Sequence, residues 1–439
     1  MKFAKLSIAA LAVIGFSSSA VAMDMSGVTA KPYVKTKLYY ETIDRDGASD
    51  ANADLFNRRN ASGQVLATAG ISGALDSCWG YGFEYNVADT LGLENILVNN
   101  TRMGAGRDSY GPDGAADFLQ TQDWASQAYV TYSPCNTVLS NTTFKVGRQF
   151  LDTPLAFTEK WNLAPNSFDA IVALNQDIKG VTLVGAYVGK GNGTFGRVTN
   201  GDRFSEYGTT ASAKGIAAVP NKGFGGLEGR GAYAVGAMTS LLEGMPINLW
   251  YYDVVGISDA LWADAGYTLK LADDMNVGLG VQYGQMMPKG QLDGKDDSSG
   301  FGVKLGGKVG IFGMTAAYSK IDTDGIVPLA NTATAFKKTK LYTAGIYTDG
   351  THVAQPGSEA FKVKAVANMN KIDLPGKIIA QYVHNENETY NRLDVDEIDA
   401  IYAVNVAGIG IKAIYINRDY DQDKVADKQH VRLILSKNF

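Results

Sequence analysis

Apolar and polar side chains alternate with a period of two along most of the chain beyond residue 30. In the first such stretch Val34, Leu38 and Tyr40 fall on one face, while Lys35 and Lys37 fall on the other. The alternation recurs at residues 64–71, 79–86, 277–283, 301–308 and 361–368. Successive side chains of a strand point to opposite faces, so each stretch predicts a strand whose two faces meet different surroundings.

The same pattern predicts eighteen strands along the chain. Their ranges are 31–43, 64–75, 79–88, 124–133, 142–150, 168–175, 180–189, 231–241, 246–255, 260–271, 275–286, 299–308, 310–320, 359–369, 376–385, 395–406, 408–418 and 428–439. A nineteenth candidate, Leu341–Tyr347, is assigned to a loop because an even number of strands returns both chain ends to one side. The apolar stretch Ala400–Ile416 admits a helix, but its β-branched residues and the break at Ala407-Gly408 favour a hairpin.

The connections between the predicted strands alternate in length. Short ones fall at 76–78, 273–274, 374–376 and 407–408, and long polar ones fall at 44–63, 89–123, 190–230 and 320–358. Barrels of the bacterial outer membrane combine tight periplasmic turns with long external loops, whereas a soluble sandwich has turns of more uniform length. The sequence therefore predicts an all-β fold, a transmembrane antiparallel up-and-down β-barrel.

Composition narrows the classes of protein that remain. The 439 residues include 50 Gly, 23 Tyr and 17 Phe, and only 19% are charged. A mean hydropathy of −0.10 is too polar for a bundle of membrane helices, each of which needs roughly 18 or more apolar residues in a row. Three His and two Cys leave little material for a metal cluster. Composition thus disfavours both a helical membrane protein and an ordinary cytoplasmic α/β enzyme.

The first 22 residues predict a cleaved signal peptide. Lys2 and Lys5 precede an unbroken apolar run at 6–16, and Ala20-Val21-Ala22 provides a small-x-small cleavage site. The apolar run is too short to span a bilayer as a retained anchor. We therefore expect an exported chain with a single barrel domain at 23–439, in which 38 basic and 45 acidic residues give a net charge of −7.

The two cysteines are predicted to form a disulfide. Cys78 lies in the short turn before the third predicted strand, and Cys135 lies just after the fourth. These strands are neighbours in an up-and-down barrel, about 4.8 Å apart, which is within the Cα separation of bridged cysteines. Because an exported chain reaches an oxidising compartment, we expect a Cys78–Cys135 bridge at the periplasmic rim rather than two thiols.

Two segments resemble parts of known outer-membrane proteins. The last strand closes with Phe439, which is similar to the C-terminal signal that bacterial barrels present to their assembly machinery. Residues 144–190, FKVGRQFLDTPLAFTEKWNLAPNSFDAIVALNQDIKGVTLVGAYVGK, resemble the Opr-type porins, including the major outer-membrane porins of the Campylobacter kind. The resemblance implies an 18-stranded barrel, commonly a homotrimer, whose third loop folds inward. This constriction loop would span about 151–167.

Such a barrel would let ions and small hydrophilic solutes diffuse passively across the outer membrane. Eighteen strands enclose more space than their own side chains fill, so pore width and charge set selectivity. At the constriction we expect Arg148, Asp152, Glu159, Lys160 and Asp169. On the pore wall we expect Lys35, Lys37, Glu84, Lys145, Lys304, Lys362, Lys364, Lys412 and Arg432, together with Glu41, Asp264, Glu397 and Asp399.

Two points about these charges stay open. Strict alternation from Val146 would face Arg148 outward, and a bulge at Gly147 would return it to the lumen. The net charge of −7 and the acidic loops predict weak cation selectivity, whereas the mainly basic lumen positions favour anions. Each charge also has a simpler interpretation as a solvated lumen residue without a selective role.

Other chemistry is weakly represented. Asp44, Asp46 and Asp50 have carboxylates at calcium-like spacing, but they do not complete an EF-hand, and we expect no cofactor. An enzyme barrel would need a nucleophile and base, and only Ser358 and His352 are near each other in sequence. A surface adhesin is the other alternative, and conductance would distinguish it from a porin. Expected partners are solutes, lipopolysaccharide and the assembly machinery, and not nucleic acid.

Overall fold

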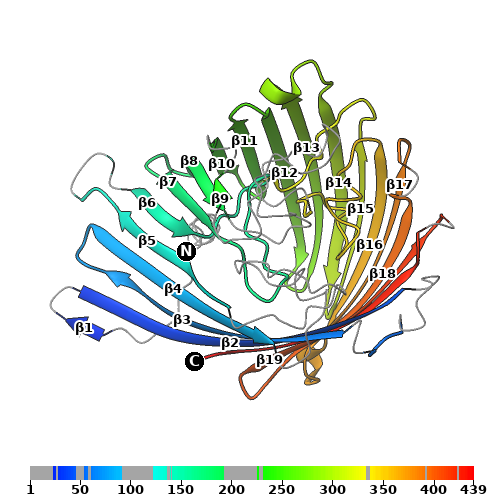
Figure 1. Cartoon of the computed structure of the whole chain (residues 1–439), viewed down its shortest axis with the longest axis horizontal. Helices are drawn as coiled ribbons and strands as arrows, with labels where there is room; N and C mark the ends of the chain where they lie inside the picture. Colours follow the sequence, from blue (N-terminus) through cyan, green and yellow to red (C-terminus); the bar gives the residue numbers. More distant parts are fainter. Residues whose placement is uncertain are drawn as a thin grey trace, which may run out of the picture.

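The alternating stretches form the wall of a closed barrel (Figure 1). The computed structural model describes residues 23–25, 28–45, 54–57, 61–90, 122–135, 139, 141–191, 225–226, 231–332, 337–390, 393–422 and 425–439. Within these ranges, no helix is long and apolar enough to cross a membrane. The predicted signal peptide, residues 1–22, lies outside the described residues.

Eighteen strands of the described residues make the wall. They are β2 (Val28–Arg45), β3 (Ala61–Ala74), β4 (Trp79–Thr90), β5 (Gln122–Tyr132), β6 (Thr142–Gln149), β7 (Phe168–Asn175), β8 (Val181–Gly191), β10 (Ala232–Leu242), β11 (Met245–Val254), β12 (Ser258–Ala272), β13 (Met275–Pro288), β14 (Ser298–Val309), β15 (Phe312–Ile321), β16 (Ser358–Asn368), β17 (Lys377–Asn387), β18 (Val395–Val406), β19 (Ile409–Tyr420) and β20 (Lys428–Asn438). Two short strands lie outside the ring, β1 (Met23–Met25) against the start of β2 and β9 (Gly225–Gly226) against the end of β8. Short 3-10 helices, η5 (Gly290–Leu292) and η7 (Met369–Ile372), occupy two connections.

Each wall strand pairs antiparallel with the next one along the chain, and β8 pairs with β10. The ring closes between the first and last strands, from Lys35 opposite Asn438 to Arg45 opposite Lys428. The predicted eighteen-stranded antiparallel barrel is thus confirmed. Leu341–Tyr347 is not a strand, and the stretch once open to a helix is the β18–β19 hairpin, with Ala407 and Gly408 at positive φ in its turn.

The two faces of the wall differ as the alternation predicted. Outward positions carry aliphatic and aromatic side chains that stay exposed, such as Phe83, Val146, Ile171, Leu279 and Phe301. Their inward neighbours are polar, small or packed against material inside the barrel. An apolar outer belt around a polar interior is what a barrel surrounded by lipid requires.

The predicted disulfide is confirmed. Cys78 and Cys135 are bonded, with their Cα atoms 5.6 Å apart. The Ser133 amide donates to the Cys78 carbonyl at 2.8 Å, and the rings of Trp79 and Tyr132 lie 4.6 Å apart beside the bridge. The bond therefore ties the start of β4 to the end of β5 at the edge where the short turns lie.

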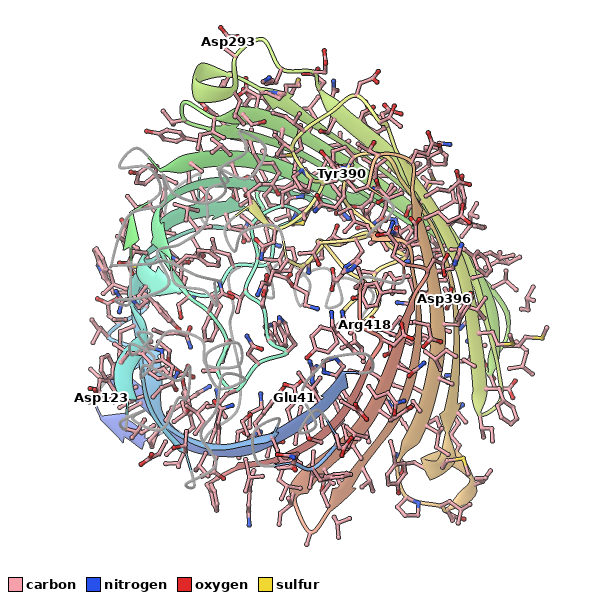
Figure 2. All side chains as sticks on the ribbon, turned by 45° about the vertical axis from the view of Figure 1, so that its right-hand side comes forward. Glu41, Asp123, Asp293, Tyr390, Asp396 and Arg418 are labelled. Carbon is pink, nitrogen blue, oxygen red and sulfur yellow. A yellow bond between two sulfur atoms is a disulfide. The ribbon has the colours of Figure 1, made fainter. Side chains whose placement is uncertain are left out.

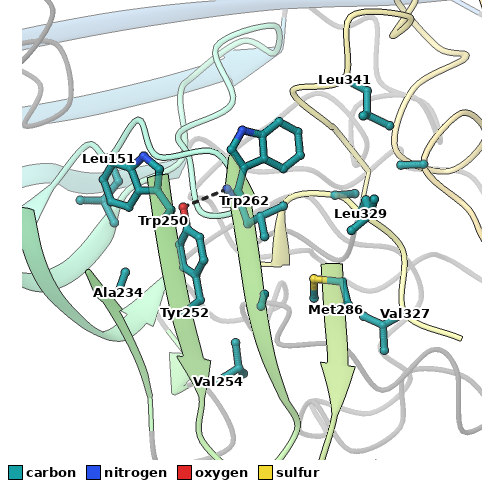
Figure 3. Close-up of a cluster of buried hydrophobic side chains, with 14 of the residues drawn as sticks. Leu151, Ala234, Trp250, Tyr252, Val254, Trp262, Met286, Val327, Leu329 and Leu341 are labelled. Carbon is teal, nitrogen blue, oxygen red and sulfur yellow. Dashed lines mark hydrogen bonds between the residues drawn. The ribbon is translucent and has the colours of Figure 1, made fainter. Parts of the chain in front are cut away.

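The apolar core lies inside the barrel rather than between layers. Figure 3 shows its larger cluster, in which Trp250, Tyr252 and Trp262 of the wall meet Leu329 and Leu341 of the long connection between β15 and β16. A smaller cluster joins side chains of β2, β3, β4 and β5 to the constriction loop; its members are Tyr39, Leu66, Ala88, Trp124, Leu163 and Ala164. Two chain segments thus fill part of the lumen, as Figure 1 shows.

Candidate functional site

The first half of the constriction loop is a compact turn that packs on one side of the wall. Pro154 has no N–H to donate, and the Thr153 hydroxyl organises the turn by donating to the Ala156 carbonyl at 2.7 Å and accepting the Ala156 amide at 3.2 Å. The Leu155 amide donates to the Tyr252 hydroxyl of β11 at 3.3 Å, the contact drawn in Figure 3. Leu155 is buried in the larger cluster, so the turn is anchored by apolar packing.

The second half of the loop reaches a different arc of the wall. The Glu159 amide donates to the Asn166 side chain at 2.6 Å, and the Glu159 carboxylate accepts the Trp161 indole N–H at 3.0 Å. The Lys37 ammonium of β2 donates to the Asn162 carbonyl. Leu163 is fully buried in the smaller cluster with side chains of β2 to β5. The loop therefore crosses the lumen from the β11 side to the β2 side.

A second segment occupies the lumen, and the sequence did not predict it. Residues 322–332 and 337–357, which we call the inner segment, were expected to form a long external loop. Instead, Val327, Leu329, Leu341 and Val353 are buried in the larger cluster. Such apolar residues are unusual in an external loop, so they were the feature of the sequence that could have predicted the burial of this segment. Burial also lowers the pKa of His352 to about 3 and raises that of Asp349, whose carboxylate accepts Lys338 Nζ at 2.9 Å.

The inner segment and the constriction loop are bonded to each other. The Asn331 side chain accepts the Phe157 amide at 3.2 Å, and its amide nitrogen donates to the Phe157 carbonyl at 2.8 Å and to Glu159 Oε1 at 3.2 Å. Thr332 donates through its amide and hydroxyl to the Leu155 carbonyl, at 2.8 and 2.7 Å. The Lys340 ammonium lies 2.6 Å from the Asp152 carboxylate. These contacts therefore join the two segments inside the barrel.

The inward carboxylates are engaged by neighbouring groups. Glu84 accepts Lys35 at 3.1 Å, Tyr33 at 2.9 Å and Ser126 at 2.7 Å. Three further acids are bonded to other side chains or backbone amides. Glu41 binds Arg432, His430, Tyr39 and Tyr347; Asp399 binds Gln381; and Glu397 accepts the amides of Ile346, Tyr347 and Thr348. In Figure 2, Glu41 and Arg418 are turned towards the lumen.

Within the part of the chain that the structure describes, four inward lysines, Lys37, Lys160, Lys377 and Lys412, form no ion pair with a carboxylate. A cavity of about 720 Å³, which we call the basic cavity, is lined by Lys37, Lys160, Lys377, Lys412 and Arg432. Trp161 and Ile346 also line it, and no Asp or Glu is among its described lining residues. Asn370, Gly376 and Asn405 place it towards the short turns, the side expected to face the periplasm. Of the predicted constriction residues, Lys160 lines this cavity, while Asp152 and Glu159 are bonded to the inner segment.

Arg148 and Asp169 were expected at the constriction, and this placement is corrected by the structure. They pair with each other across β6 and β7, with Arg148 Nε and Asp169 Oδ1 2.8 Å apart. The two residues lie on the same face as Val146 and Ile171, which are 44% and 49% exposed on the outside. Gly147 has a φ of 119°, but the register runs through it without a shift, so the bulge that would have turned Arg148 to the lumen is absent there.

The other predicted wall lysines face inward in different settings. Lys145 is fully buried with its Nζ 3.8 Å from the Tyr129 ring centre, and Lys304 Nζ lies 3.9 Å from that of Tyr342. Lys362 donates to the Ala344 carbonyl of the inner segment. Lys364 lies opposite Gln381 and Thr315 in the wall. These positions follow the alternation, and their role in selectivity stays a prediction.

The remaining expectations concern the chain end, calcium and catalysis. Phe439 is exposed, and its amide donates to the Val34 carbonyl at 2.8 Å; its role in assembly stays a prediction. Asp44 lies at the end of β2, whereas Asp46 and Asp50 lie outside the described residues, so the calcium hypothesis stays untested. Ser358 donates to the His352 backbone carbonyl at 2.7 Å rather than to its imidazole.

A closed eighteen-stranded barrel with an apolar outer belt, a charged lumen and segments folded into it defines an outer-membrane porin. Residues 1–326 match the Campylobacter major outer membrane protein family, and the chain belongs to this family. It is therefore a channel of the bacterial outer membrane for small solutes, and the family and the fold indicate a channel rather than an enzyme.

Solved porins of Pseudomonas aeruginosa share the fold. OccK9 (OpdG) has a TM-score of 0.71 and 16% identity, with 93% of this chain and 98% of that chain covered. OccD3 (OpdP) has a TM-score of 0.66 and 14% identity, covering 96% and 93%. OpdK, solved with vanillate, has a TM-score of 0.67 and 12% identity, covering 93% and 98%. No curated protein matches the chain.

Proposed function

We propose that this channel favours small anionic solutes and that the basic cavity is the part of the pore that selects them. The observation that carries the proposal is the lining of that cavity, in which the described residues include four lysines and no carboxylate. The fifth cation of the lining, Arg432, is paired with the buried Glu41. Lys160, Lys377 and Lys412 are exposed to the lumen. Cations grouped in a concave, low-dielectric site raise the local concentration of anions.

The charge partners found elsewhere in the lumen also support a preference for anions. Two of the wall acids that would attract cations, Glu84 and Glu41, are paired with Lys35 and Arg432, which compensate their charge where it lies. Asp399 is held by the side-chain amide of Gln381. The net charge of −7 expected for the mature chain acts at the mouths and is screened within about 10 Å at 0.1 M salt. OpdK, a protein of the same fold, was solved with vanillate, an aromatic carboxylate.

The test is a reversal potential measured in planar bilayers under a KCl gradient with about 0.1 M salt or more on both sides, so that the charge at the mouths stays screened. We expect chloride preference, which Lys160→Glu and Lys412→Glu should each weaken. Lys371→Glu is the matched control, since Lys371 is exposed in η7, outside the basic cavity. Potassium preference of the unmodified channel, or equal shifts from Lys160→Glu and Lys371→Glu, would contradict the proposal.

We further propose that the outward Arg148–Asp169 pair lies in a contact between protomers of a homotrimer. A charge facing lipid near the bilayer midplane costs about 2–4 kcal/mol, so an ion pair there is favoured where another protein surface covers it. Arg148 also donates to the Ala125 carbonyl at 3.0 Å, and the small side chains of Ala125 and Ala128 flank it on the same face. Native electrophoresis of Arg148→Ala should show loss of trimer, and an unchanged oligomer would contradict this placement.

A further inference from the structure

One wall carboxylate holds three consecutive backbone amides of the inner segment. Glu397 lies on β18 with its side chain fully buried. Its Oε1 accepts the Ile346 amide at 2.5 Å, and its Oε2 accepts the Tyr347 and Thr348 amides at 3.0 and 2.6 Å. Successive amides that converge on one anion form a nest, and hydrogen bonds to a charged acceptor are roughly twice as strong as neutral ones.

Other wall groups contact the same short stretch, each through fewer hydrogen bonds than Glu397 forms. The Tyr347 hydroxyl donates to Glu41 of β2, and Lys362 of β16 donates to the Ala344 carbonyl. Arg418 of β19 lies opposite Glu397 in register, with its guanidinium carbon 4.5 Å from the Tyr347 ring centre. Residues 344–348 are therefore the point at which the inner segment meets the wall from four strands.

The anchored stretch leads directly to the pore. Ile346, whose amide Glu397 accepts, lines the basic cavity beside Lys160 and Trp161. In the other direction along the segment, Asn331 and Lys340 hold the constriction loop at Phe157 and Asp152. One carboxylate is thus connected to both the cavity lining and the loop that crosses the lumen.

We propose that Glu397 is a positioning residue of the pore, which holds the inner segment in the lumen and through it sets the width of the channel. The inference rests on the proposed route through the basic cavity but not on the sign of the solutes that pass. In the uncharged variant Glu397→Gln, the side-chain NH2 would face amide donors that the carboxylate now accepts. In Glu397→Asp the charge stays, but the side chain is one methylene shorter.

The first measurement is single-channel conductance in planar bilayers. Glu397→Gln should raise conductance by roughly twofold or add frequent transitions to a wider state, because pore diameter limits the current. Glu397→Asp should lie between Glu397→Gln and the unmodified channel. Glu359→Gln is the matched control: Glu359 lies on the outward face of β16 with Phe361, and it accepts Lys320 of the neighbouring strand β15 at 3.1 Å.

The second measurement reports the position of the inner segment. Ala354 is fully buried in the larger cluster, and the two native cysteines are bonded to each other. A cysteine placed there by Ala354→Cys should react with a charged methanethiosulfonate reagent roughly tenfold faster when Glu397→Gln is added, because local opening exposes it. Heat-modifiable mobility on gels verifies that the barrel has assembled.

The outcomes separate this inference from the proposed selectivity. Assembled Glu397→Gln and Glu397→Asp channels with unchanged conductance and an unchanged thiol reaction would overturn the positioning role. If Glu397→Gln does not assemble, Glu397→Asp still decides the matter through the same two readouts. The reversal potential of the unmodified channel tests anion preference alone, so either idea can fail while the other stands.

Discussion

The constriction loop and the inner segment both lie inside the barrel, but they are held there in different ways. The constriction loop is folded largely on itself, around Thr153 and Asn166, and meets the wall mainly through apolar packing. The inner segment takes polar contacts from many strands; these come from Glu41, Gln282, Ser298, Lys362 and Glu397. Two wall acids, Glu41 and Glu397, thus hold this segment, whereas the basic cavity is lined by lysines.

Deleting the constriction loop should have the largest effect. Removal of 151–167, with a short glycine-serine link in its place, should raise conductance by roughly twofold or more, because the loop crosses the lumen. The barrel should still assemble, since the β6–β7 ladder ends at Gln149 and Phe168, outside the deletion. Single-channel recording measures the change, and shortening the rim connection at Asp293 (Figure 2) is the control. Wild-type conductance in an assembled deletion variant would remove the loop from the pore.

Separating the two segments should have a smaller effect. Asn331→Ala removes hydrogen bonds to the Phe157 backbone and to Glu159, and leaving such buried groups without partners costs about 1–3 kcal/mol. We expect a noisier open channel with a modest rise in mean conductance, together with a lower unfolding temperature. Asn417→Ala is the control, because Asn417 bonds Asp419 and leaves both segments untouched. Quiet, wild-type currents from Asn331→Ala would show that the segments do not depend on this link.

Acidification should loosen the inner segment at His352. Burial, and then the charge of Arg418, lower the pKa of His352 to about 3 from its usual 6.5, so the packed segment favours neutral imidazole. The neutral imidazole stabilises the packed inner segment fully above pH 6.5. This stabilising free energy is lost as the pH falls from 6.5 towards 3, by about 1.4 kcal/mol for each pH unit. Asp349 acts in the opposite sense at lower pH, because burial raises its pKa and its protonation favours the packed state.

Channel recordings between pH 7 and pH 5 test this sensitivity. The unmodified channel should show more open-state fluctuation as the pH falls below 6.5, and His352→Gln should have a flatter profile. His384→Gln is the control, since His384 lies near the outer rim between Asp396 and Glu386. An identical pH profile for His352→Gln and the unmodified channel would assign the effect to other groups.

The barrel was predictable from the sequence, whereas the filling of its lumen was not. A wall between lipid and water imposes a period of two on every strand, which is why the strand ranges, the ring and the Cys78–Cys135 bridge could be derived. Alternation also placed Arg148 outward, and the bulge invoked to bring it inward is absent. The inner segment depends on contacts with distant strands, such as Glu397 with Tyr347, and no local period marks them.

The disulfide should have the smallest effect on the pore. It stabilises the barrel wall, whereas the contacts considered above fix the two segments inside the lumen. Cys78 and Cys135 lie 57 residues apart in sequence and join β4 to β5 at the edge with the short turns, away from both inward segments. Loop-closure entropy gives a stabilisation of roughly 4 kcal/mol at most, acting mainly on the unfolded chain. Cys78→Ser with Cys135→Ser should therefore lower the temperature at which the barrel unfolds on gels while leaving conductance and reversal potential unchanged. Reduction of the unmodified protein should have the same two results, and a change in conductance would mean that the wall beneath the smaller cluster transmits strain to the constriction loop.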